Sequence, residues 1–76
     1  MNEIFRKILE SYFLNCYFLN FKAFENSVKK YFGMFCDIIM SADRLLISAN
    51  NEKIAEYQVE FNKEGYLIKI NNLNFE

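Results

Sequence analysis

The stretch that decides the fold is residues 54–70, which read IAEYQVEFNKEGYLIKI. Apolar and polar residues alternate along its first half, and most of the apolar ones are aromatic or β-branched. This period of two is typical of a half-buried strand. A polar turn with Gly65 at its end follows, and the returning segment places Tyr66, Ile68 and Ile70 on one side of a second strand. We therefore expect a β-hairpin, with Gly65 at the turn position that needs a positive φ angle.

A helix is the competing interpretation of residues 52–64. Four glutamates in this segment are spaced by four residues, and Ile54, Tyr57 and Phe61 also fall at helical spacing. The pattern alone allows either structure. The turn residues and the matching return segment favour the hairpin, which is the interpretation that we adopt.

Two shorter apolar runs precede the hairpin. Residues 34–40 (MFCDIIM) and 44–49 (RLLISA) each have the length of a strand. Residues 42–43 can form the turn between them, and 50–52 (NNE) provide a second turn because asparagine tolerates a positive φ angle. Together with the hairpin, these runs predict a three- or four-stranded antiparallel β-meander over about residues 34–72.

The segment before the strands has helical periodicity instead. Apolar residues fall in adjacent pairs four apart, which is the stripe of an amphipathic helix over residues 2 to about 19. The helical spacing continues over 21–32, with a bend near Asn20 as one option, and Gly33 fits a left-handed C-cap. One helix of about 30 residues and two shorter helices both satisfy the pattern.

These segments predict an α+β fold in one small domain over residues 1–76. One or two N-terminal helices, at about 2–32, pack on the antiparallel β-meander at about 34–72. In a two-layer domain of this kind the helices cover one face of the sheet.

The amino-acid composition excludes several classes of protein. The chain has 76 residues, of which 53% are hydrophobic, with nine Phe, five Tyr and a formal charge of −1. This is too aromatic for a disordered tail and lacks the basic excess of a protein that binds nucleic acid through bulk charge. The chain has no His and only two Gly, and no catalytic motif matches. We expect a protein that is not an enzyme and needs no cofactor.

No segment approaches the ~18 consecutive apolar residues of a membrane span, and the N-terminus lacks the pattern of a secretory signal. We therefore expect no membrane span and a cytoplasmic location. In that compartment Cys16, placed in the first helix, and Cys36, placed in a strand, would be reduced and buried. Two cysteines without histidine fall short of the four ligands of a structural zinc site.

The two halves of the chain differ in charge. Residues 1–33 carry five basic and three acidic side chains, a net charge of +2, whereas residues 34–76 carry four basic and seven acidic ones, a net charge of −3. The acidic half suits a protein partner with a basic groove, because carboxylates pair with the Lys and Arg that line such grooves. The candidate partner-binding residues on the predicted sheet are Asp37, Glu52, Glu56, Glu60 and Glu64.

The basic half supports an alternative function, a small nucleic-acid-binding regulator. Its candidate phosphate contacts are Lys22, Lys29 and Lys30, which is a small number for such a surface. A third hypothesis is an enzyme or enzyme subunit in which Asp37 and the glutamates hold a metal ion.

A surplus of apolar side chains is the strongest clue to function. A chain of this length buries only about 60% of the surface that its unfolded state exposes. We expect part of the surplus to form a homodimer interface, because two-fold pairs are the commonest assemblies. An unusually aromatic core and a docking face for another protein are the alternatives. The candidate self-interface residues are Tyr12, Phe13, Phe18, Phe21 and Phe24.

The codon usage implied by the composition points to an AT-rich genome. Phe, Ile, Lys, Tyr and Asn, whose codons are rich in A and T, make up 39 of the 76 residues. With the small size, this suits a phage or mobile-element protein. We expect an inhibitor or adaptor that occupies a partner's surface, of the type of an anti-defence protein such as an anti-CRISPR, an antitoxin or an immunity protein. This expectation rests on an analogy with the general type of such small inhibitors, and no particular residue supports it.

Overall fold

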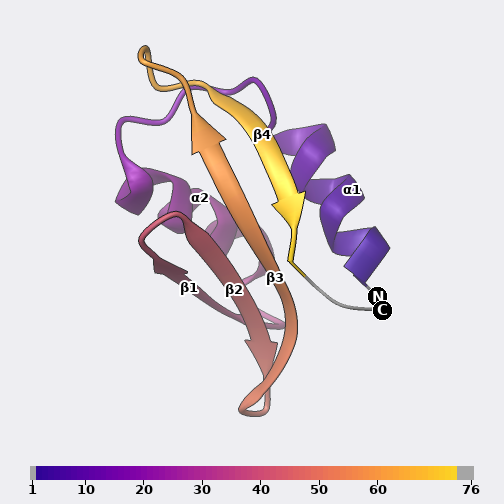
Figure 1. Cartoon of the computed structure of the whole chain (residues 1–76). Helices are drawn as coiled ribbons and strands as arrows, with labels where there is room; N and C mark the ends of the chain where they lie inside the picture. Colours follow the sequence, from indigo (N-terminus) through magenta and orange to yellow (C-terminus); the bar gives the residue numbers. More distant parts are fainter. Residues whose placement is uncertain (1, 74–76) are drawn as a thin grey trace.

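The computed structural model describes residues 2–73, which form two helices followed by a four-stranded sheet (Figure 1). The helices are α1 (Asn2–Tyr12) and α2 (Phe21–Phe32). The strands are β1 (Asp37–Ser41), β2 (Arg44–Ala49), β3 (Glu52–Phe61) and β4 (Leu67–Asn72). All neighbouring strands are antiparallel and their order in the sheet is β1-β2-β3-β4. The predicted α+β fold with a meander is confirmed, and the helical interpretation of residues 52–64 is wrong.

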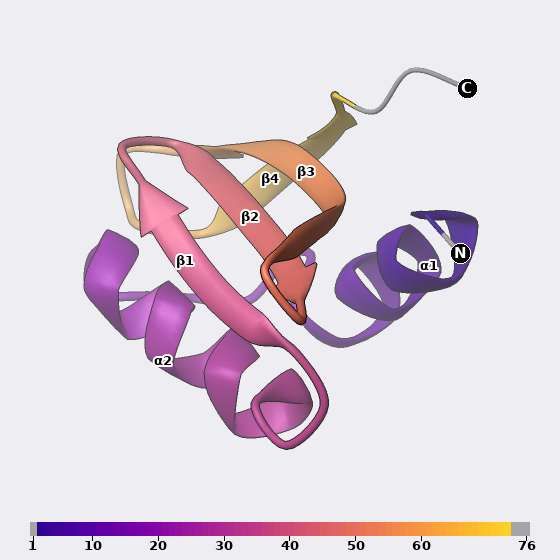
Figure 2. The same cartoon turned by 90° about the horizontal axis from the view of Figure 1, so that it is seen from below.

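The two helices lie on the same side of the sheet (Figure 2). Helix α2 packs against β1, and α1 lies against β3 and β4. Within residues 2–73 no element covers the opposite side of the sheet, which we call the open face. The fold is therefore a two-layer structure with one buried and one solvated sheet face.

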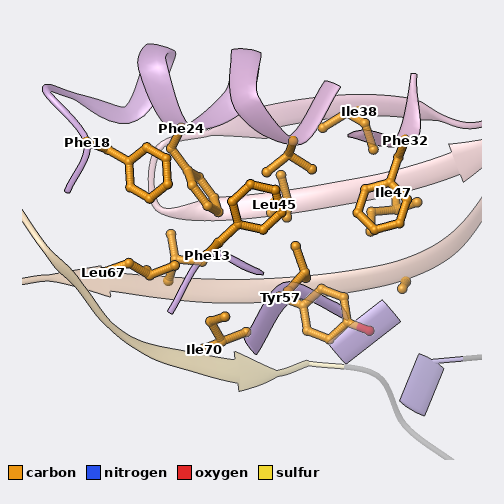
Figure 3. Packing of buried hydrophobic residues seen from close by; sticks show 14 residues of the cluster. Phe13, Phe18, Phe24, Phe32, Ile38, Leu45, Ile47, Tyr57, Leu67 and Ile70 are labelled. Carbon is orange, nitrogen blue, oxygen red and sulfur yellow. The ribbon is translucent and has the colours of Figure 1, made fainter. Parts of the chain in front are cut away.

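The core between the two layers is rich in phenylalanine (Figure 3). The ring of Phe24 meets the rings of Phe18 at 5.1 Å and Phe61 at 5.6 Å, in each case edge to face. Such pairs stabilise a core by about 0.5–1.5 kcal/mol beyond the area that they bury. The sheet contributes the buried side chains of Ile38, Leu45, Ile47, Ala55, Tyr57, Val59, Leu67 and Ile70.

The first helix is shorter than its periodicity predicts. It ends at Tyr12, well before the predicted end, so two helices are present and not one long helix. Asn15 has a φ angle of 68°, in the left-handed region, which a right-handed helix does not enter. Asn20 then begins α2 as its N-cap, because its side-chain oxygen accepts a hydrogen bond from the Ala23 N–H at 2.8 Å. Cys16, expected in a helix, lies exposed in the connection.

The connection between the helices pairs with the sheet. Three backbone hydrogen bonds, which we call the seam, join it to the end of the β3–β4 turn and to the first residue of β4. Asn15 N–H donates to the Leu67 carbonyl at 2.7 Å, and Leu67 N–H donates to the Cys16 carbonyl at 2.9 Å. Phe18 N–H donates to the Gly65 carbonyl at 2.8 Å. These bonds satisfy backbone groups that a longer helix would have satisfied internally, and this is why the apolar run is extended.

The turns follow the sequence with one correction. Ala42 and the pair Asn50 and Asn51 have positive φ angles of 54°, 53° and 65°, as turn residues between strands. Gly65 has the predicted positive φ angle, at 99°. Gly33 does not form the predicted left-handed C-cap, because its φ angle is −62° and its N–H donates to the Lys29 carbonyl as in a continuing helix. The first strand accordingly begins at residue 37 and not at 34.

A bulge in β4 changes which residues face the core. Pairing with β3 passes from Leu67 directly to Lys69, so Ile68 is an extra residue. Leu67 and Ile70 are buried, whereas Tyr66 and Ile68 are about half exposed. The predicted common side for Tyr66, Ile68 and Ile70 is therefore wrong, because a bulge interrupts the period of two.

Replacement of Gly65 by alanine tests the seam. A Cβ atom at residue 65 would lie 2.7 Å from the Tyr17 ring and 2.9 Å from the Phe18 carbonyl oxygen, on a residue with positive φ. We expect Gly65→Ala to lower the free energy of unfolding by about 2–4 kcal/mol, from the left-handed backbone and the forced displacement together. Urea titration measures this loss. Lys63→Ala, in the same turn and exposed, is the control and should change it by less than about 0.5 kcal/mol; equal effects would contradict the role of the seam.

Candidate functional site

The predicted self-interface residues do not form one surface. Phe13, Phe18 and Phe24 are buried in the core, with Phe24 at 0% exposure, so these three are not available to a partner. Phe18 points inward because the seam holds its segment extended, and Phe24 lies on the face of α2 that packs on the sheet. Tyr12 and Phe21 remain exposed. Part of the apolar surplus is therefore an aromatic core, which was the alternative to an interface.

The five predicted acidic residues are spread over the sheet. Asp37, Glu56 and Glu60 lie on the open face, where neighbouring residues in each strand point to the core. Glu52 begins β3 and Glu64 lies in the turn after its end, so these two are at opposite ends of a ten-residue strand. The structure does not bring the five carboxylates into one cluster.

Basic side chains also offset the acidic charge of the open face. Glu56 contacts Arg44 at 3.4 Å and Lys53 at 3.3 Å. Glu60 lies opposite Lys69 in the pairing of β3 with β4. Exposed pairs of this kind contribute about 0–1 kcal/mol each, and they leave less negative potential for a basic partner.

Two of the three predicted nucleic-acid contacts are paired within their own helix. The Nζ atoms of Lys22 and Lys29 lie 3.1 and 4.0 Å from the carboxylate oxygens of Glu25, and Lys30 is exposed. Glu25 is itself buried, with 8% exposure. Its Oε2 atom accepts a hydrogen bond of 2.9 Å from the backbone N–H of Met40 in β1. We call this set of contacts the Glu25 clasp; it leaves the basic helix face with less charge to offer a phosphate backbone.

The clasp changes the titration of Glu25. The Met40 N–H, followed by the hydrogen bond from Lys22, holds the pKa of the Glu25 carboxyl below its ordinary value, although partial burial opposes the shift. The ionised form of Glu25 is therefore the form that stabilises the folded chain.

An exposed apolar surface lies over the seam, where the α1–α2 connection passes beside the β3–β4 hairpin (Figure 1). The backbones of Tyr17 and Tyr66 pair in an isolated antiparallel β-bridge. The centroids of their rings lie 5.7 Å apart, edge to face. Leu19 follows on the same side as Tyr17, because Phe18 between them points inward, and the bulge leaves Ile68 outward beside Tyr66. We call the four exposed residues the edge patch: Tyr17 (54% exposed), Leu19 (75%), Tyr66 (45%) and Ile68 (49%).

A groove of about 340 Å³ adjoins the edge patch. One wall is the end of the connection, with Leu19 and the exposed Phe21, and the other is the hairpin, with Phe61 and Lys63. The groove is open to solvent and offers an apolar floor beside a lysine. An incoming apolar side chain could be seated there, next to the edge patch.

Sequence reasoning missed all four residues of the edge patch and identified only Phe21, which lines the adjoining groove. No alternation of apolar and polar residues marked this segment as extended, because Tyr17, Phe18 and Leu19 are all apolar and also fit the helical spacing of the preceding residues. Two further exposed side chains, Met34 and Phe35, lie in the α2–β1 connection.

Other kinds of site find no support in the described part of the chain. Between residues 2 and 73, no three side chains of the metal-binding types Cys, Asp and Glu gather at one place. None of the described helices has the length and apolar character to cross a membrane. Comparisons with protein-family models, with curated proteins and with solved structures found no match to this chain.

A pair of substitutions separates the core from the edge patch. Phe24→Ala removes a fully buried ring, and we expect it to lower the free energy of unfolding by about 3–5 kcal/mol. Leu19→Ala removes an exposed side chain and should change it by less than about 0.5 kcal/mol. Urea titrations of both variants measure the difference. A large loss for Leu19→Ala would mean that this residue is part of the core.

The Glu25 clasp predicts a component of acid sensitivity. The lowered pKa means that the stability contributed by Glu25 is fully present above the ordinary glutamate pKa of about 4.3, and is lost as the pH falls through the folded-state value. We expect the thermal midpoint of the wild type to fall more steeply than that of Glu25→Gln as the solution is acidified, measured by circular dichroism. Parallel curves for the two proteins would contradict the assignment.

Proposed function

We propose that this chain is a small non-enzymatic protein-binding module, an inhibitor or adaptor that acts by occupying a partner's surface. The observation that carries the proposal is the edge patch, four large exposed apolar side chains on two segments that pair at Tyr17 and Tyr66. Contiguous exposed apolar patches are uncommon on proteins without a partner and mark interaction surfaces.

Both the rigid backbone and the residue types of the edge patch suit it to binding a protein. The three hydrogen bonds of the seam hold the backbone beneath the edge patch, so little conformational entropy would be lost on binding. Tyrosine is enriched in the energetically important parts of interfaces because it combines an apolar ring with a hydroxyl. Two of the four residues are tyrosines in contact with each other.

The charges near the edge patch are of both signs. Lys63 and Glu64 lie in the adjoining turn, and Lys69 with Glu60 lies across the bulge. A rim of mixed charge around an apolar centre suits a protein partner better than the uniformly negative backbone of a nucleic acid. This favours the protein-binding hypothesis over the nucleic-acid-binding regulator.

The partner in this proposal is a host or element-encoded protein, or a second copy of the chain. The AT-rich composition and the small size support an origin in a phage or mobile element, as in an anti-CRISPR or other anti-defence protein, an antitoxin or an immunity protein. A homodimer through the edge patch is the form that a self-interface would take on this structure, since the predicted Phe13, Phe18 and Phe24 are in the core.

Matched isoleucine variants test the proposal. Ile68 in the edge patch and Ile39 on β1 are both about half exposed, so their replacement by serine removes a similar apolar side chain from different places. We expect Ile68→Ser and Leu19→Ser to weaken binding of the partner by tenfold or more, and Ile39→Ser to leave it unchanged. The readouts are the native mass across dilution, for self-association, and quantitative capture of a partner by the three variants and the wild type.

Each outcome bears on a different hypothesis. Loss of the same captured protein from both edge-patch variants supports the proposal. Equal capture by all four proteins overturns it. Capture of nucleic acid that weakens with added salt would instead favour the hypothesis of a nucleic-acid-binding regulator. Lys30→Ala would then reduce the capture of nucleic acid.

A further inference from the structure

The two edges of the sheet are covered in different ways. At β4 the seam supplies backbone partners from the α1–α2 connection. At β1, which pairs with β2 on one side only, a side chain supplies the partner, because the Met40 N–H donates to the Glu25 carboxylate at 2.9 Å. An exposed strand edge is a template for pairing with another chain, and proteins cover such edges to prevent it.

The carboxylate takes the place of an added strand. In an antiparallel sheet the acceptor for an outward N–H would be a carbonyl oxygen of the next strand. Oε2 of Glu25 occupies that position, and Lys22 and Lys29 contact the same carboxylate at 3.1 and 4.0 Å. A buried, hydrogen-bonded carboxylate is held more firmly than a surface side chain, so in the folded protein the Met40 N–H is occupied and does not pair with another strand.

We propose that the edge of β1 is a self-pairing surface that Glu25 keeps closed, and that withdrawal of the carboxylate lets a second copy of this chain pair with β1 in antiparallel fashion. The sequence of the strand, Asp37–Ser41 (DIIMS), suits pairing with a second copy of itself. In the two-fold register centred on Ile39, each Asp37 lies opposite a Ser41, so no like charges meet. The Met40 N–H then faces the Ile38 carbonyl of the second copy, which replaces the lost acceptor.

This inference does not depend on the proposed function. The edge patch is joined to the β4 edge of the sheet and the clasp to the β1 edge, and Phe21 lies between the groove beside the edge patch and the pocket beside Glu25. Self-association through the edge patch would be present in the wild type, whereas pairing through β1 arises only when Glu25 is changed. The native mass of a variant is therefore compared with that of the wild type at the same concentration.

Three variants at the clasp test the inference. Glu25→Ala removes the acceptor, and Glu25→Asp keeps the charge near the lysines but is one methylene too short to reach β1. Glu25→Gln is the matched control, because its amide oxygen still accepts from the Met40 N–H. We expect the native mass of the first two to be twice that of the wild-type species at high concentration, with reversal on dilution, and that of Glu25→Gln to be unchanged. Circular dichroism shows which variants are folded.

A second substitution decides where the new contact lies. Met40→Pro removes the outward N–H from an edge strand, where proline is tolerated and blocks strand addition. We expect Glu25→Asp combined with Met40→Pro to return to the wild-type mass, which would support pairing through β1. If Glu25→Asp is folded and keeps the wild-type mass at every concentration, the inference is overturned. A doubled mass that persists with proline at residue 40 also overturns it, because the contact then lies elsewhere.

Discussion

The seam is the interaction on which the rest of the structure depends. It fixes an apolar segment as extended chain at the start of β4, and this decides that α1 stops at Tyr12 and that α2 begins after Asn20. Because the segment is extended, Phe18 enters the core while Tyr17 remains outside. The aromatic centre of the core and the exposed edge patch are thus two sides of the same short piece of backbone.

The fold could be predicted from the sequence wherever local chemistry agreed with the tertiary structure. The alternation through Tyr57 and Val59 and the turn at Gly65 identified the hairpin, because a half-buried strand and a left-handed glycine leave local signals. The segment around Tyr17 could not be predicted, since its residues satisfy a helical period and its conformation is set by hydrogen bonds to residues about fifty positions away. The bulge at Ile68 is non-local in the same sense, because it exists only in the pairing with β3.

Prediction of the site was weaker for the same reason. The carboxylates and lysines were grouped by their positions in the chain, whereas the structure pairs Glu56 with Arg44 and Lys53, and Lys22 with Glu25. Net charge by segment does not report such neutralisation, which depends on side chains brought together by folding. The aromatic residues were misplaced because burial cannot be read from composition. Phe24 was predicted at an interface but belongs to the core, and Tyr17 is exposed because the seam holds its segment extended.

The long separation of the partners in the seam has a consequence for synthesis of the chain. The strands are joined by short turns and can pair soon after they leave the ribosome, but Cys16 must wait for Leu67, which follows it by about fifty residues. Closing so long a loop is entropically unfavourable until the sheet has brought its ends together. During translation the α1–α2 connection therefore lacks its partner in the sheet, and Phe18 has no seam to hold it toward the core, until the start of β4 has emerged.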